Sequence, residues 1–453
     1  MQNQIRSFFI VMLGEIIVSL FVTGGAKAQA PVLKGFTEYP ITFWWGPPPA
    51  ETTEARYNEM AQAGFNLAAP PGPDRPGDYS PFFDPKLSRK VLDFCQKFDM
   101  KGLIADKRIN QILSQNGDVN ILVDSVVAEF KDHPALWGYY IMDEPGTDPF
   151  PKLGQIVARI REKDPKHIAY INLFPNYVPL ELVKVDSYRE YLERYVNEVK
   201  PDLICYDHYH FIQPGKVAEK PASFVNEQAQ VAWEAAQSQS KGNDREGFFN
   251  NLEVVREVAK EHHLPFMVIV LLTTHGGYRD LTEAELRWEA FQCLAYGSSA
   301  LSWFTYWAPP DENVWHFRHA IFNWNGERTD HYDRVKRINA DLRAMGNRLM
   351  GRESLAVFHV GNEADHDVKH FAPFGAVQAI TGEPLTVGFF EDGYILLANK
   401  NYRQPTKVTI SLSAATSVKL FDCIKNKEHM LKVKNNTITI TLQPGDAELI
   451  RLK

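Results

Sequence analysis

The amino-acid sequence predicts an α/β protein, a (β/α)8 TIM barrel followed by an all-β sandwich domain. The first observation is a series of short apolar stretches that alternate with amphipathic segments from Ile41 to Leu301. Such stretches are typical of parallel strands joined by helices, and eight units of roughly 37 residues favour a closed barrel. The second is a change, near Arg352, to short strands of alternating polarity. The third is length, because one barrel and one small domain account for 453 residues.

Residues 1–30 have the pattern of a signal peptide. Arg6 supplies a positive start, an apolar run from Phe8 to Val22 follows, and Ala28 and Ala30 form a small-x-small cleavage pattern. The alternative is a membrane anchor, but the run is shorter than the ~20 residues a span needs, and Glu15 would be costly in lipid. We therefore expect an exported protein, periplasmic or extracellular, cleaved near Ala28 or Ala30 and without stable membrane insertion.

Residues 31–352 are predicted to form the barrel. Each candidate strand is followed by a segment with helical periodicity, as the repeated βα unit requires. The candidate strands are Ile41–Trp45, Asn66–Ala69, Gly102–Asp106, Leu136–Asp143, Ile168–Leu173, Leu203–Tyr209, Phe266–Leu271 and Ala300–Tyr306.

The helices between these strands have sequence signals at their starts. Asp118 is placed as the N-cap of one helix, Asp148 as the N-cap of the next, and Thr282 with Glu285 forms a capping box. The segment from Phe211 to Arg245 is too long for a simple connection. We expect it to contain an extra helix, 224–236, and to overhang the carboxyl ends of the strands.

Residues 353–453 are predicted to form the β-sandwich, in which no catalytic constellation is evident. Apolar residues alternate with polar ones between turns, as expected for strands with one buried face. The candidate strands are Leu385–Phe390, Tyr394–Asn399, Lys407–Leu412, Thr437–Leu442 and Glu448–Leu452.

The composition restricts the classes of partner. The net charge is −7 and the sequence contains no basic run, which argues against nucleic acid. Aromatic residues form 12% of the chain, and several Trp lie beside predicted loops, where an aromatic face can stack on the C–H face of a sugar. The four cysteines are far apart, and we expect buried thiols. The partner predicted is a carbohydrate; the sequence gives no oligomeric state.

Catalytic groups of such a barrel lie at the carboxyl ends of its strands. Strand four ends in Asp143 and Glu144, strand six reaches Asp207, and strand three reaches Asp106, whereas strand seven is followed by Thr273-Thr274-His275 without a carboxylate. Adjacent strand residues point to opposite sides, so only Asp143 or Glu144 should face the barrel mouth directly.

Glu144 is the candidate general acid. Tyrosines and a tryptophan precede it in strand four, and a carboxyl group partly removed from water has a raised pKa and keeps its proton near neutral pH. The alternative is that Asp143 and Glu144 only cap the following helix. We disfavour it because Asp148 is already placed as that cap.

The run Trp137-Gly138-Tyr139-Tyr140-Ile141-Met142-Asp143-Glu144-Pro145 resembles strand four of the clan A glycoside hydrolases, which carry an acid/base Glu there, usually after Asn. Tyr206-Asp207-His208-Tyr209 and Phe304-Thr305-Tyr306-Trp307 are also similar to strands of exported bacterial barrels of the β-galactosidase-like type. The resemblance spans residues 40–350. It implies an O-glycosyl hydrolase with Glu144 as the acid and Asp143 in the Asn position.

The resemblance also implies a nucleophilic Glu on strand seven, which this sequence lacks. Asp207 is our first choice for the second carboxylate and Asp106 the second; Asp207 could instead be a structural acid. His208 and His210 have a spacing compatible with zinc, but no third ligand is evident, and we expect neither metal nor cofactor.

Two functions are compatible with these sequence features. One is a glycoside hydrolase that acts on an oligo- or polysaccharide with Glu144, Asp207 and Asp143 as catalytic residues. The other is a non-catalytic glycan-binding protein on a barrel without its strand-seven nucleophile. The residues expected to bind the substrate are Trp44, Trp45, Asp106, His208, Tyr209, His275, Tyr306, Trp307 and Trp315.

Overall fold

The structure is a computed structural model that describes residues 30–78, 82–115, 117–213, 244–310, 315–361, 368–382, 384–413 and 416–453. The predicted signal peptide, up to residue 29, and the predicted helix at 224–236 lie outside these residues and stay predictions.

The N-terminal part is a closed parallel barrel, which confirms the predicted fold class. Strands pair in the two half-barrels β1-β8-β7-β6 and β2-β3-β4-β5. Isolated parallel bridges, Gly46 to Pro71 and Leu173 to Tyr206, join the halves. The strands are β1 (Ile41–Trp44), β2 (Leu67–Ala68), β3 (Lys101–Ile104), β4 (Leu136–Asp143), β5 (Ile168–Asn172), β6 (Ile204–His208), β7 (Phe266–Leu271) and β8 (Ala300–Phe304).

Each barrel strand is buried on both sides, which explains its continuous apolar sequence. One core fills the barrel interior and another lies between the strands and the surrounding helices. In β6, Cys205 belongs to the interior core, whereas Tyr206 belongs to the helix-side core. Asp207 shares the parity of Cys205 and therefore faces inward.

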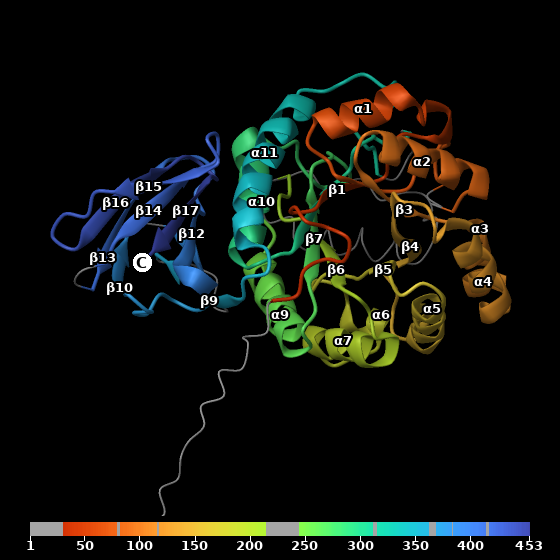
Figure 1. The fold of residues 1–453 in the computed structure, drawn as a ribbon, viewed down its shortest axis with the longest axis horizontal. Helices are drawn as coiled ribbons and strands as arrows, with labels where there is room; N and C mark the ends of the chain where they lie inside the picture. The colour runs from red at the N-terminus through yellow and green to blue at the C-terminus, as the bar shows by residue number, and fades with distance from the viewer. Residues whose placement is uncertain are drawn as a thin grey trace, which may run out of the picture.

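The helices surround the barrel (Figure 1). Asp118 caps α4 and Thr282 with Glu285 forms the capping box of α10, as predicted. The prediction for Asp148 was wrong, because α5 begins one residue later, after Pro149, and Asp148 pairs with Lys184 at 2.5 Å. The helices are α1 (Glu54–Gln62), α2 (Pro85–Lys97), α3 (Lys107–Gln115), α4 (Val119–Phe130), α5 (Phe150–Lys163), α6 (Leu180–Val183), α7 (Tyr188–Arg194), α9 (Phe248–Glu261), α10 (Glu283–Ala295) and α11 (His331–Leu349).

The C-terminal part is a sandwich of two antiparallel sheets around its own apolar core, with strand orders β10-β13-β16 and β15-β14-β17-β12-β11-β9. The sequence missed β9, β10, β14 and β15, in which polar and apolar residues alternate poorly. The strands are β9 (Ser354–Val360), β10 (Val377–Thr381), β11 (Leu385–Phe390), β12 (Tyr394–Asn399), β13 (Thr406–Leu412), β14 (Val418–Asp422), β15 (Lys427–Leu431), β16 (Thr437–Leu442) and β17 (Ala447–Leu452).

Helices α9, α10 and α11 lie between the barrel and the sandwich (Figure 1). The junction is tight at α10, where the indole of Trp288 donates to the carbonyl of Lys400 at 3.0 Å. Gly445 allows this approach, since its φ is +67° and a Cβ atom there would lie 1.9 Å from the carbonyl oxygen of Ala284. The sandwich is therefore packed against the barrel rather than tethered to it.

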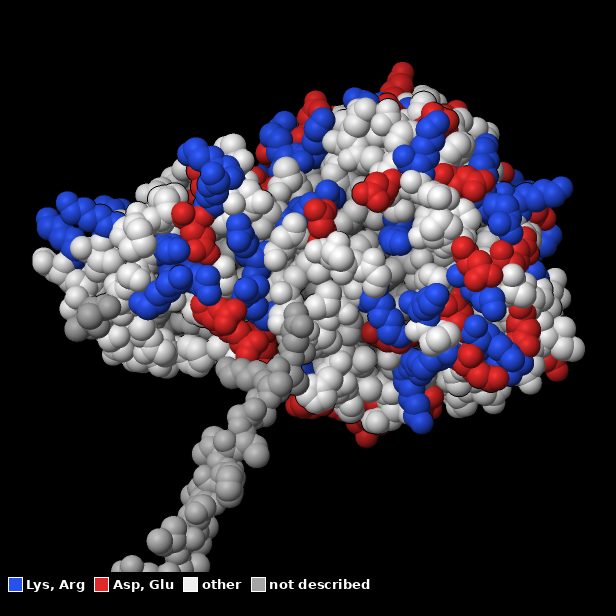
Figure 2. Space-filling view, in the orientation of Figure 1, with Lys and Arg blue, Asp and Glu red and all other residues white. Residues whose placement is uncertain are grey.

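Acidic and basic side chains are interspersed over the face shown in Figure 2. Within the described parts of the chain, no helix has the length and apolar character needed to cross a bilayer. Cys95, Cys205 and Cys293 are buried free thiols, as expected, and Cys423 is a partly buried one.

Candidate active site

Three carboxyl groups meet at the carboxyl ends of β4 and β6. In the parallel register, Asp143 lies opposite Asn172, the last residue of β5. The Asn172 amide nitrogen donates to both Asp143 and Asp207, at 3.0 Å each. Because both oxygens bond to one nitrogen, they lie within roughly 6 Å of each other. Asn172 therefore joins the ends of three adjacent strands.

Glu144 joins this cluster because its backbone leaves the strand conformation. Its φ is +42°, a left-handed value that costs free energy in a residue with a Cβ atom. Its backbone N–H donates to the carbonyl of Asn172 at 2.9 Å, which holds the turn. The side chain contacts Asp207 through a carboxyl–carboxyl hydrogen bond. The expectation that only one of Asp143 and Glu144 reaches the mouth is corrected, since the turn breaks the alternation of the strand.

The contact between Glu144 and Asp207 requires a proton. Burial, and then the charges of Asp207 and Asp143, hold the pKa of Glu144 well above its usual range. Burial also raises the pKa of Asp207, to about 6, although hydrogen bonds from Asn172 and Glu144 oppose the rise. Two carboxylates in contact cannot both ionise easily, so they share one proton. Glu144 is the donor and Asp207 the acceptor.

Asp143 is the most exposed of the three carboxyl groups, since Glu144 is only partly exposed and Asp207 is buried. The surrounding protein still raises its pKa, to about 7, opposed by the hydrogen bond from Asn172. Exposure makes the cost of ionisation smaller than at Glu144, so we assign the shared proton to Glu144. Asp143 adds negative charge that favours this protonation.

A chain of polar groups orients the Asn172 amide. The thiol of Cys205 donates to the side-chain oxygen of Asn172 at 3.4 Å, and the hydroxyl of Tyr170 lies 3.1 Å from the same sulfur. This contact identifies the side-chain oxygen of Asn172 and turns its NH2 group toward the carboxyl groups. Cys205 thus has a structural part in the site without being a nucleophile.

Aromatic side chains lie beside the carboxyl cluster. Tyr209, two residues beyond Asp207, packs 5.7 Å from His275 and 5.1 Å from Phe304. Trp45 packs 5.6 Å from Phe304, and Trp315 lies 6.1 Å from His275. We call Trp45, Tyr209, His275, Phe304, Trp315 and Phe317 the aromatic rim. Of the predicted sugar-binding residues, Trp45, Tyr209, His275 and Trp315 thus lie together.

His275 follows β7, the strand that has no carboxylate. Burial lowers the pKa of its ring to about 4, so the ring is neutral. Its Nδ1 lies 2.7 Å from the carbonyl oxygen of Thr273 and must carry the proton to donate there. Nε2 is consequently a hydrogen-bond acceptor, suited to a hydroxyl group and unable to act as a charged acid.

Asp106 is occupied by Arg108 and is not available to a sugar, which corrects its predicted part in the pocket. Both carboxyl oxygens are bound by Arg108, at 2.8 and 2.7 Å, and the backbone N–H of Arg108 also donates to it. Asp106 is 1% exposed and stands at the start of α3. It is therefore a neutralised structural acid.

Four other predicted sugar-binding residues are buried away from the aromatic rim. His208 faces α9, where Asn251 lies 3.0 Å from its Nδ1, because it is adjacent to the inward-facing Asp207. Tyr306 and Trp307 are buried in the helix-side core against Phe322. Trp44 lies inside the barrel beside a cavity of about 20 Å³, room for one water molecule rather than a sugar ring.

The site also contains residues that the sequence did not indicate. Asn172 is one, and Arg245 is the other. Arg245 is buried, lies 3.9 Å over the ring of Tyr177, and donates to the carbonyl oxygen of Tyr209 at 2.9 Å. Its positive charge lowers the pKa of Asp207 against the larger effect of burial. Among the described residues, no group of three or more His, Cys, Asp or Glu is placed to hold a metal ion.

No protein-family model matches the chain, and no curated protein matches its sequence. Solved structures do match its fold. A catalytic mutant of Gan42B, a GH42 β-galactosidase from G. stearothermophilus, is 9% identical with a TM-score of 0.59, over 94% of this chain and 100% of that one. A glycoside hydrolase family 5 protein from Bacteroides vulgatus is 12% identical with a TM-score of 0.51, over 92% and 89%.

A third match, the β-galactosidase from Rahnella sp. R3, has a TM-score of 0.48 at 11% identity. The match covers 72% of this chain but only 59% of that one. At such identities the likeness concerns the fold alone. The chain therefore shares the barrel-and-sandwich fold of Gan42B and of the Bacteroides vulgatus protein.

Proposed function

We propose that the protein is a glycoside hydrolase in which Glu144 protonates the leaving oxygen and Asp207 is the second carboxylate. The observation that carries this proposal is the hydrogen-bonded carboxyl pair at the ends of β4 and β6. We place the shared proton on Glu144 because burial and the neighbouring carboxyl groups raise its pKa well above its usual range. A protonated carboxyl group near neutral pH is what cleavage of a glycosidic bond requires of its acid. Asp143 supports that role by keeping the pKa of Glu144 high.

Asp207 is proposed as the nucleophile, with retention of configuration. Retaining enzymes hold their two carboxyl groups about 5–5.5 Å apart, whereas inverting enzymes need about 6.5–9.5 Å to admit a water molecule. The Glu144–Asp207 contact is shorter than both. Entry of the substrate must open the pair, and the retaining distance requires the smaller opening.

The substrate proposed is a carbohydrate that stacks on the aromatic rim. Trp45 and Trp315 are partly buried and offer apolar surface, while the neutral Nε2 of His275 can accept a bond from a sugar hydroxyl group. We also propose export of the protein, from the pattern of residues 1–30. Such an enzyme would then hydrolyse its substrate outside the cytosol.

The alternative is a protein that binds glycans without cleaving them. The absence of a carboxylate after β7, where His275 stands instead, favours it. In that case the carboxyl pair would bind sugar hydroxyl groups. The two functions predict different outcomes when turnover and binding are measured on the same ligand.

The test is a screen of the purified protein against aryl glycosides and polysaccharides, with binding measured by calorimetry. Hydrolysis by the wild type that is lost in Glu144→Gln, with binding retained, supports the proposal. Glu181→Gln is the matched control, since Glu181 is exposed in α6, and it should behave as wild type. Binding without hydrolysis by the wild type would establish the alternative.

A further inference from the structure

Arg245 is fixed at the exit of β6 by several independent contacts. Its backbone N–H donates to the carbonyl of His210 at 2.7 Å, and its side chain donates to the carbonyl of Tyr209 and to the hydroxyl of Tyr278, at 2.9 Å each. The guanidinium lies 3.9 Å over the ring of Tyr177. Arg245 is 2% exposed, so its positive charge is held in a site with little water.

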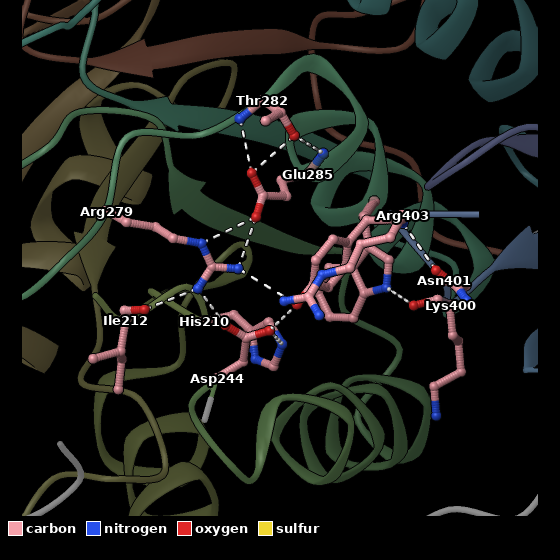
Figure 3. Close-up of polar contacts among 11 residues, drawn as sticks. His210, Ile212, Asp244, Arg279, Thr282, Glu285, Lys400, Asn401 and Arg403 are labelled. Atoms are coloured by element: carbon pink, nitrogen blue, oxygen red, sulfur yellow. Dashed lines mark hydrogen bonds and ion pairs between the residues drawn. The ribbon is translucent and has the colours of Figure 1, made fainter. Parts of the chain in front are cut away.

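The preceding residue, Asp244, is bound by both domains (Figure 3). Arg279 of the barrel donates to one of its oxygens, and the hydroxyl of Tyr402, from the sandwich, donates to the other at 2.5 Å. Arg279 is itself held by Glu285 at 2.7 Å and by the carbonyl of Ile212 at 2.8 Å. A shift of the sandwich at Tyr402 would therefore reach Arg245 through one peptide unit.

The charged and titratable groups around Asp207 come from several elements. Glu144 and Asp143 lie beside it at the end of β4. Arg245, from the segment before α9, donates to the carbonyl of Tyr209, two residues beyond Asp207, so its positive charge lies beside the end of β6. The phenols of Tyr177, Tyr188 and Tyr209 and the thiol of Cys205 also surround it, but burial raises the pKa of each, so they stay neutral. Among the described residues named here, Arg245 is thus the cation that opposes the two acidic neighbours of Asp207.

We propose that Arg245, anchored through Asp244 by Tyr402 of the sandwich, is a positioning residue that keeps Asp207 ionised while Glu144 holds the proton. The effect of Arg245 on Asp207 does not depend on the proposed function; only its consequence for catalysis rests on that function. Without the cation, the three carboxyl groups would retain more protons, and Asp207 would lose the charge that a nucleophile needs. The sandwich would accordingly be part of the catalytic unit.

The protonation of Asp207 can be followed through the pH dependence of the free energy of unfolding, without a measurement of activity. The folded-state pKa of Asp207, about 6, lies above its usual value of 3.8. Ionisation therefore costs folding stability: relative to Asp207→Asn, the wild type is most stable below about pH 4 and loses that advantage up to about pH 6. The difference between the two proteins in free energy of unfolding, measured by denaturant at several pH values, reports this window.

Arg245→Met should extend the upper end of this window by roughly one pH unit, as expected when one neighbouring charge is removed. Arg245→Lys should largely restore the wild-type window, since it keeps the charge. Tyr402→Phe removes only the hydroxyl that binds Asp244, so it should shift the window in the same direction by less. Arg256→Met is the matched control, because Arg256 is a buried arginine of α9 paired with Glu253, and should leave the window unchanged.

An unchanged window in Arg245→Met would overturn the proposal, and an unchanged window in Tyr402→Phe would remove the sandwich from it. If Arg245→Met fails to fold, Arg245→Gln, which removes the charge but keeps hydrogen-bond donors, takes its place, and an unchanged window in that variant would overturn the proposal. A shifted window in a protein that cleaves no glycoside would instead contradict only the proposed function. In an active enzyme, the same variants should move the acid limb of the pH–kcat/KM profile upward.

Discussion

Asp106 and Asp207 stand at the same edge of the barrel, and both are nearly inaccessible to solvent, with exposures of 1% and 5%. Asp106 is bound on both oxygens by Arg108, as a structural ion pair. Asp207 receives one bond from the neutral amide of Asn172 and meets a second carboxyl group. The comparison teaches that a buried acid at a strand end becomes reactive when its surroundings leave its charge poorly compensated.

The largest effect should come from Asp207→Asn. We expect a fall in kcat/KM of about 10²–10⁴-fold, since a missing acid, base or nucleophile typically costs that much. The amide keeps the shape of the side chain, so the midpoint of thermal unfolding should change little. Steady-state kinetics and calorimetry on one preparation check both parts; unaltered turnover would remove Asp207 from the mechanism.

Asp106→Asn should show the opposite pattern. Breaking a buried ion pair typically costs about 3–5 kcal/mol, and Arg108 keeps Glu129 as a second partner at 2.8 Å, so we expect about 3 kcal/mol. Denaturant unfolding gives this value. Under conditions in which the variant is folded, its activity should stay within a few-fold of wild type. A loss of activity as large as that of Asp207→Asn would contradict the distinction between Asp106 and Asp207.

Asn172→Ala should fall between the two. It removes the donor that Asp143 and Asp207 share, and hydrogen bonds to charged groups are worth about 1.5–3 kcal/mol. That range corresponds to a loss of about 10–100-fold in kcat/KM. The acid limb of the pH profile should also move upward, because the bond from Asn172 lowers the pKa of Asp207. A change in KM alone would instead indicate a role in binding substrate.

The smallest effect is the pH dependence of the wild type. Activity requires Asp207 ionised and Glu144 protonated, so kcat/KM should fall below about pH 6 as Asp207 takes up a proton. On the alkaline side, kcat/KM should also fall, because Glu144 loses the proton that it must donate. The residual activity of Asp207→Asn should be mapped over the same pH range, and its profile should lack the acid limb. If the acid limb persists in Asp207→Asn, it belongs to Asp143.

The sequence predicted most of the barrel because parity and burial are local properties. All eight strands were found within about two residues of their bounds, and Glu144 and Asp207 followed from the rule that strand ends carry the site. Strand parity could also have predicted the orientation of His208, since a residue adjacent to an inward-facing Asp207 must face outward. Arg108, two residues from Asp106, was a signal of the structural ion pair.

Other features depend on contacts that are distant in the sequence. Asn172 is a single amide at the end of an ordinary strand, and only its register against Asp143 makes it part of the site. Arg245 lies beside the end of β6, bound to the carbonyls of Tyr209 and His210, because the chain returns there before α9, which no local pattern specifies. The left-handed turn at Glu144 is similar, since most residues avoid that conformation and a sequence without glycine there gives no indication of it.

The central claim, that Glu144 is the general acid, is tested most directly by varying the leaving group. Hydrolysis of a series of aryl glycosides should be compared between the wild type and Glu144→Gln. A poor leaving group such as phenol needs the proton, whereas dinitrophenol leaves without it. We expect a loss of about 10²–10⁴-fold for the phenyl glycoside and a much smaller one for the dinitrophenyl glycoside. Equal losses across the series, or none, would contradict the assignment.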